Sequence, residues 1–134
     1  MKKLLIIFLL IFGGLHSFAQ DDDNERIRDK MKEFIQRRLN ISRAEAGRFA
    51  PIFVRYFREW RTTLRETPDI LLRQQRVAEL RMRYREEFKP ILGEHRSNQV
   101  FVQQDVFIHE LINMQKENRM MKDRPGKRFR STLQ

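Results

Sequence analysis

Histidine and methionine are the side chains of this sequence best suited to binding a metal. The chain has three His, six Met and no Cys, so thiolate ligands and disulfides are excluded. One conceivable set combines His95, His109, Met114 and Met120, since imidazole and soft thioether ligands suit copper. Their positions do not follow a metal-ligand spacing, and the methionines fit a hydrophobic stripe. We therefore expect no metal and no cofactor.

Catalytic patterns are equally sparse. His109 and Glu110 resemble the start of the zinc-protease HExxH motif, but Asn113 stands where the second ligand would be. No Ser and His form a recognisable nucleophile motif, and five glycines leave no Gly-rich phosphate loop. We therefore expect a protein that is not an enzyme.

Aromatic residues interleaved with arginines offer a different chemistry, which is binding. One helical stripe between residues 46 and 64 is strongly aromatic, and its first expected role is to form the core. A partly exposed stripe would instead line a groove with a basic rim, which suits unfolded or acidic protein clients. The expected client-binding residues are Phe53, Tyr56, Phe57, Trp60, Arg48, Arg55, Arg58 and Arg61.

The periodicity of apolar residues is helical throughout, and no alternating stretch indicates a strand. It predicts helices over about Glu25–Leu39, from Ser42 to about Thr67, over Asp69–Lys89 and over Glu94–Asn118. The predicted fold is all-α, with four amphipathic helices arranged as kinked helical hairpins.

Capping and breaking residues mark the expected ends of these helices. Ser42 and Glu45 have the spacing of a capping box. Pro51 lies inside the second helix and predicts a kink, because it cannot donate to the carbonyl four residues earlier. Pro90 disfavours helical geometry at the residue before it, and Gly93 is a possible N-cap of the last helix.

The last predicted helix has an unusually wide apolar face. It spans more than one neighbouring helix normally covers, which suggests two partners, one of them a second subunit. The homodimer hypothesis depends on this face. Its residues are Val100, Phe101, Phe107, Ile108, Leu111, Ile112 and Met114.

The N-terminal sequence is typical of a cleavable secretory signal peptide. Lys2 and Lys3 precede the apolar run Leu4–Phe12, and the small residues Ser17 and Ala19 predict cleavage before Gln20. The expected organisation is a signal peptide over 1–19, a helical domain over 20–118 and a basic disordered tail over 119–134. Removal of Lys2 and Lys3 with the signal peptide lowers the formal net charge from +10 to +8. This charge, which is mostly arginine, favours acidic or aromatic partners, and export argues against nucleic acid.

Two segments carry a resemblance to a known family. Leu39–Glu45, followed by Phe49–Ile52, resembles the first LTxxQ-type motif of the Spy/CpxP family of small periplasmic proteins. Ile91–Arg96 lies where a second copy would be. Ser42 replaces Thr and Glu45 replaces Gln in the first copy, whereas Gly93 and Arg96 replace them in the second. The motif positions are Ile41, Ser42, Glu45, Leu92, Gly93 and Arg96.

The resemblance implies a periplasmic all-helical protein that forms a curved antiparallel dimer. It also implies an ATP-independent chaperone or a regulator of envelope-stress signalling. The partners would be unfolded or acidic clients, or a membrane-bound signalling protein. Related small helical proteins imply two alternatives, a heavy-metal sensor and a regulator of an extracytoplasmic-function sigma factor.

Overall fold

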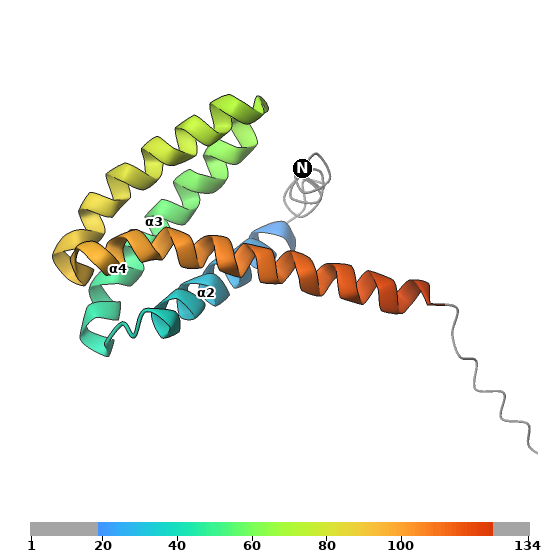
Figure 1. The fold of residues 1–134 in the computed structure, drawn as a ribbon, viewed down its shortest axis with the longest axis horizontal. Helices are drawn as coiled ribbons and strands as arrows, with labels where there is room; N and C mark the ends of the chain where they lie inside the picture. The colour runs from blue at the N-terminus through green and yellow to red at the C-terminus, as the bar shows by residue number, and fades with distance from the viewer. Residues whose placement is uncertain (1–18, 125–134) are drawn as a thin grey trace, which may run out of the picture.

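The computed structural model describes residues 19–124, and all of their regular structure is helical. The helices are α2 (Ala19–Arg38), α3 (Arg43–Glu66) and α4 (Ile70–Asp123) (Figure 1). No strand occurs within this range. The all-α prediction is therefore confirmed. The prediction of four helices is wrong, because the last two are joined into one helix of 54 residues.

Helix α4 bends sharply at Gly93, whose φ of 81° and ψ of 172° are not helical. We call residues 70–92 its first arm and residues 94–123 its second arm. The first arm lies beside α3 and forms a hairpin with it, while the second arm turns back across α3 and α2 (Figure 1). Sequence correctly marked Gly93 as a break. The expected helix end at Lys89 is wrong, since the helix continues through Pro90 to the bend.

The turn between α2 and α3 satisfies the free backbone groups of both helices. Asn40 has a φ of 50°, and the Ile41 N–H donates to the Gln36 carbonyl at 2.9 Å, as in a Schellman C-cap. The Glu45 N–H then donates to Ser42 Oγ at 3.1 Å, and the Ser42 N–H donates to Glu45 Oε1 at 3.0 Å. The predicted capping box is thus confirmed. Helix α3 continues without a break through Pro51.

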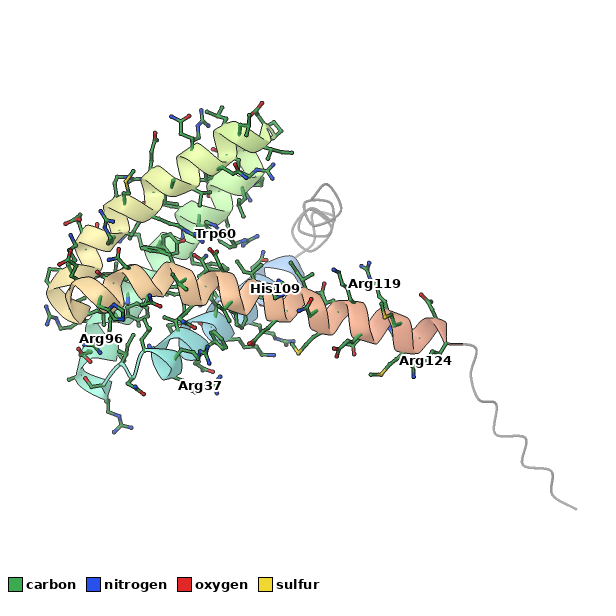
Figure 2. All side chains as sticks on the ribbon, viewed as in Figure 1. Arg37, Trp60, Arg96, His109, Arg119 and Arg124 are labelled. Atoms are coloured by element: carbon green, nitrogen blue, oxygen red, sulfur yellow. The ribbon has the colours of Figure 1, made fainter. Side chains whose placement is uncertain are left out.

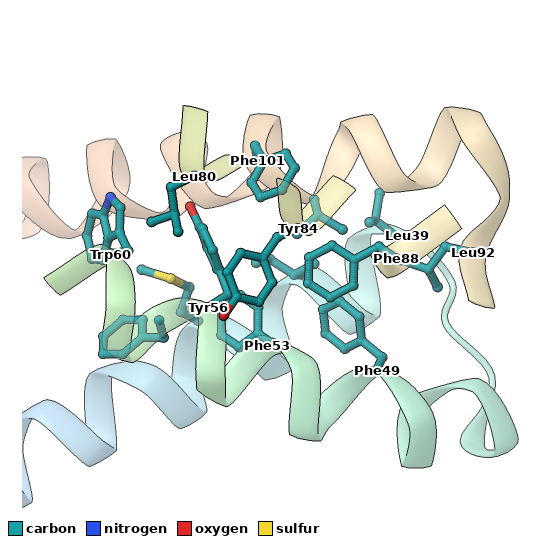
Figure 3. Packing of buried hydrophobic residues seen from close by; sticks show 14 residues of the cluster. Leu39, Phe49, Phe53, Tyr56, Trp60, Leu80, Tyr84, Phe88, Leu92 and Phe101 are labelled. Carbon is teal, nitrogen blue, oxygen red and sulfur yellow. The ribbon is translucent and has the colours of Figure 1, made fainter. Parts of the chain in front are cut away.

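The core is an aromatic cluster centred on α3 (Figure 3). Ring centroids lie 5.1 Å apart for Phe49 and Phe88 and 5.3 Å apart for Tyr56 and Tyr84. Tyr56 also meets Phe101 of the second arm at 5.3 Å. The α3 stripe therefore packs against both arms of α4 at once. Its buried members are Phe49, Phe53, Tyr56, Phe57 and Trp60.

The helix ends differ from the predicted ones at both termini of the described range. Helix α2 begins at Ala19 instead of Glu25, and α4 reaches Asp123. Residues 119–123, expected to belong to a disordered tail, are therefore helical. The rest of that tail, from 125 onwards, and residues 1–18 of the predicted signal peptide (1–19) lie outside the described residues. Between residues 19 and 124, no helix has the length and apolar character needed to cross a membrane.

Candidate binding surfaces

The four aromatic residues expected to contact clients lie in the core. Phe53 and Tyr56 are 0% exposed, and Phe57 and Trp60 are 3% exposed. The expectation of an open aromatic groove on these side chains is therefore wrong. The two arms of α4 pack over the stripe together and leave at most a ring edge at the surface.

The expected arginine rim is divided among different surfaces. Arg48 and Arg58 are exposed, whereas Arg61 is half-buried. Arg55 donates to Glu87 Oε2 at 2.7 Å and lies 5.7 Å from the ring centroid of Tyr84. Arg58 and Arg61 instead line a pocket on the side of α3 that faces α2. These arginines do not form one continuous surface.

The two motif segments meet at the bend end of the molecule. Arg96 donates to both carboxylate oxygens of Glu45, with Nη1 to Oε1 at 3.0 Å and Nη2 to Oε2 at 2.5 Å. Its Nε also donates to the Leu92 carbonyl at 3.0 Å. We call this arrangement the Glu45–Arg96 clamp. It ties the start of α3 to the start of the second arm, 51 residues further along the chain.

The clamp changes the acidity of its carboxylate. Hydrogen bonds from Arg96 and then from the Ser42 backbone lower the pKa of Glu45 to about 2. Ile41 packs on the edge of the core, and Leu92 is buried. With Gly93 at the bend, the motif positions therefore act together in holding the fold. Sequence could not pair Glu45 with Arg96, because only the three-dimensional structure brings them together.

A polar network with a buried centre, which sequence reasoning missed, joins the hairpin to the second arm. The Tyr56 hydroxyl donates to Gln104 Oε1 at 2.5 Å, and Arg81 Nη2 donates to the same oxygen at 2.9 Å. Arg81 also binds both carboxylate oxygens of Asp105, at 2.7 and 3.2 Å. Burial raises the pKa of Tyr56 to about 12. The available signal was a glutamine at a core-facing position of a helical stripe.

An open cleft lies between the hairpin and the second arm, next to this network. It has a volume of about 630 Å³. Its apolar lining includes Leu64, Val77 and Ile108, together with Trp60. Charged side chains from both arms of α4 also line it, among them Arg73 and Asp105. Of the expected client-binding residues, only Trp60 lines this cleft.

The histidines of the described range are both exposed. His109 lies on the second arm, well removed from Arg96 at the bend (Figure 2), and His95 lies close to the bend. Among the described side chains, no three His, Cys, Asp or Glu residues lie close enough together to hold a metal ion.

Comparison of the chain with protein-family models, with curated proteins and with solved structures finds no match.

Proposed function

We propose that the protein is a non-enzymatic binding protein of the cell envelope, and that it holds apolar segments of partly unfolded proteins in its cleft without using ATP. The observation that carries this proposal is the combination of apolar and charged side chains that line one open cleft. Such a cleft offers hydrophobic contact without deep enclosure, and its charged side chains add electrostatic attraction. Neither interaction requires a defined partner sequence. Regulation of envelope-stress signalling through a bound partner protein would use the same surface.

The proposal also draws on the expected signal peptide and on the resemblance to the Spy/CpxP family. In the structure the two motif segments meet, and Glu45 and Arg96 connect them directly. Export would bring the protein to a compartment without ATP, where passive binding is the available way to protect an unfolded chain.

Suppression of aggregation of an unfolded model protein, without ATP, tests the function. Ala78 is exposed and lines the cleft, so Ala78→Glu should weaken client binding while the helices stay intact. Met82→Glu is the matched control, because Met82 is 52% exposed on the same arm and does not line the cleft. Protection lost in Ala78→Glu and kept in Met82→Glu is the expected result. If the wild type gives no protection, the chaperone function is wrong and a signalling role becomes the better proposal.

We further propose that two copies form a curved antiparallel dimer through the end of the second arm. Positions on the core-facing side of this arm follow alternating spacings of four and three, the heptad pattern of helix pairing. Near the start of the arm they are covered within the chain, since Phe107 meets Phe34 of α2 at 5.5 Å. Further along, Met114 is 56% and Met121 is 66% exposed. The positions are Val100, Gln104, Phe107, Leu111, Met114, Asn118 and Met121.

The wide apolar face of the second arm, which suggested a dimer, is covered mainly by other helices of the same chain. Phe101 packs on Tyr56 and Phe88, whereas Phe107 packs on Phe34. Both neighbours of that part of the face therefore belong to the same chain. The dimer proposal now depends on the exposed methionines beyond it.

Sedimentation at micromolar concentration tests the dimer. Met121→Glu places a charge on the heptad stripe and should shift the protein towards a monomer. Met120→Glu should not, because Met120 is equally exposed, at 66%, but points away from the stripe. A wild-type monomer, or equal effects of the two variants, would show that this surface does not pair.

A further inference from the structure

Three arginines converge on a pocket between the first half of α2 and the second half of α3. Arg28 comes from α2, and Arg58 and Arg61 come from successive turns of α3. The pocket has a volume of about 260 Å³. Phe57, 3% exposed, supplies part of its apolar wall. Neither the cleft nor the proposed dimer surface includes these residues.

The charges lining this pocket are strongly unequal. Among the described residues that line it, Glu25 is the one carboxylate, against three guanidinium groups. Arg28 Nε donates to Asp29 at 3.2 Å, so that arginine is partly neutralised from outside the pocket. Arg58 makes no hydrogen bond or ion pair with any side chain in the described range. Gathering like charges costs electrostatic energy, and a bound anion would offset that cost.

The type of basic side chain in the pocket indicates which anions it can bind. All three are arginine, whose planar guanidinium presents paired N–H donors that match two oxygens of one phosphate. Asn24 at the rim adds a side-chain amide that can donate as well. The pocket is smaller than the usual range of about 300–1,000 Å³ for sites that enclose drug-sized ligands. It suits a single tetrahedral anion with its water, or a phosphate group attached to a larger molecule outside.

We propose that the pocket formed by Arg28, Arg58 and Arg61 binds a phosphate group. The same chemistry is offered by free inorganic phosphate and by the phosphate monoester headgroup of an anionic lipid. In both cases the phosphate oxygens accept hydrogen bonds from the guanidinium groups, and the α2–α3 contact holds the donors in place. Arg28 and Arg58 lie on different helices, so a bound phosphate also links α2 to α3.

Calorimetry and thermal unfolding in inorganic phosphate, against chloride at the same ionic strength, test the site. We expect saturable binding and a higher melting temperature in phosphate. Arg58→Gln and Arg28→Gln should each weaken binding about tenfold, the loss expected for a charge-assisted hydrogen bond. Arg48→Gln is the matched control, because Arg48 is exposed on the same helix and lies outside the pocket. Circular dichroism shows whether each variant keeps its helices.

Vesicle co-sedimentation separates the two sources of phosphate. Phosphatidic acid presents a phosphate monoester, whereas the phosphate of phosphatidylcholine is a diester that carries the cationic choline group. Retention on phosphatidic acid that Arg58→Gln removes and Arg48→Gln keeps would identify a lipid headgroup as the ligand. Binding of free phosphate without vesicle retention would identify a soluble ligand. The proposal is overturned if neither probe binds, if chloride reproduces the stabilisation, or if Arg58→Gln and Arg48→Gln behave alike.

Discussion

The bend end of the molecule and its free ends are built in contrasting ways. At the bend end, the turn after α2, the Glu45–Arg96 clamp and Gly93 surround a core in which Phe49 and Phe88 are 0% exposed. From there the hairpin and the second arm diverge (Figure 1). Each of them ends in exposed apolar residues. Leu71 at the hairpin tip is 77% exposed, and Met120 near the end of the second arm is 66% exposed. Stability is thus concentrated at one end and surface for partners at the other.

Exposure at the hairpin tip does not imply a loose tip. Asp69 caps α4 by accepting from the Leu72 N–H at 2.8 Å. Arg73 Nε donates to the Thr67 carbonyl at 2.7 Å, and Arg76 donates to Thr67 Oγ1 at 3.2 Å. These bonds tie the loop to the first turns of α4. The difference between the two ends lies in how much apolar surface is buried.

The largest expected effect comes from removing a ring at the bend end. Phe88 is fully buried and meets Phe49, Tyr84 and Phe101. Phe88→Ala should lower the free energy of unfolding by about 3–5 kcal/mol, because it removes apolar contact and leaves a cavity. Urea unfolding followed by circular dichroism measures the change. A loss below about 1 kcal/mol would show that this end is not the stable one.

The next largest loss of stability is expected from a substitution at the bend. Gly93 has a φ of 81° and a ψ of 172°, a region that is essentially restricted to glycine. Gly93→Ala should therefore cost about 1–3 kcal/mol, although open space surrounds the position. Gly47→Ala is the control, because Gly47 is helical with no contact within 4 Å of an added Cβ, and it should stabilise by about 0.5–1 kcal/mol. Equal effects of the two changes in chemical unfolding would contradict the strain argument.

Sequence predicted the features of the bend end that are local. A capping box spans three residues, and a stripe of rings spans one helix, so Ser42, Glu45 and Phe53 could be assigned from spacing alone. Gly93 could be predicted as a helix boundary because glycine adopts backbone conformations that other residues disfavour. The partner of Glu45 was not predictable, because Arg96 approaches it only when α4 folds back at the bend.

The binding surfaces were harder to predict for the same reason. The cleft depends on the angle between the hairpin and the second arm, which no local pattern encodes. Periodicity placed Trp60 on an apolar face but could not show that α4 would cover it to 3% exposure. Arg28 was not linked to Arg58, since these arginines belong to different helices and approach each other only through tertiary packing.

The Glu45–Arg96 clamp predicts a specific acid sensitivity. Hydrogen bonds from Arg96 lower the pKa of Glu45 in the folded state to about 2, from its ordinary value of 4.5. The unfolded chain therefore takes up the proton first, and the clamp's contribution is complete above about pH 4.5 and is lost as the pH falls towards 2. Between these values the wild type should lose more stability than Glu45→Gln, which has no carboxylate to titrate. Parallel pH profiles of the two proteins in urea unfolding would show that the clamp contributes nothing measurable.

The smallest effect is expected at the hairpin tip. Leu71 is 77% exposed, and Leu80, on the same arm, is 3% exposed. Leu71→Ser should change the free energy of unfolding by no more than about 0.5 kcal/mol, as exposed positions usually do. Leu80→Ser is the matched change, and it should cost at least about 2 kcal/mol, because it empties a core position and buries a hydroxyl there. Urea unfolding of the two variants compares one substitution in two environments of one helix. A large loss in Leu71→Ser at low protein concentration would mean that the tip is covered within the chain. A loss of stability that appears only at high protein concentration would mean that a second copy covers the tip. The two ends would then differ in buried apolar surface only in the monomer.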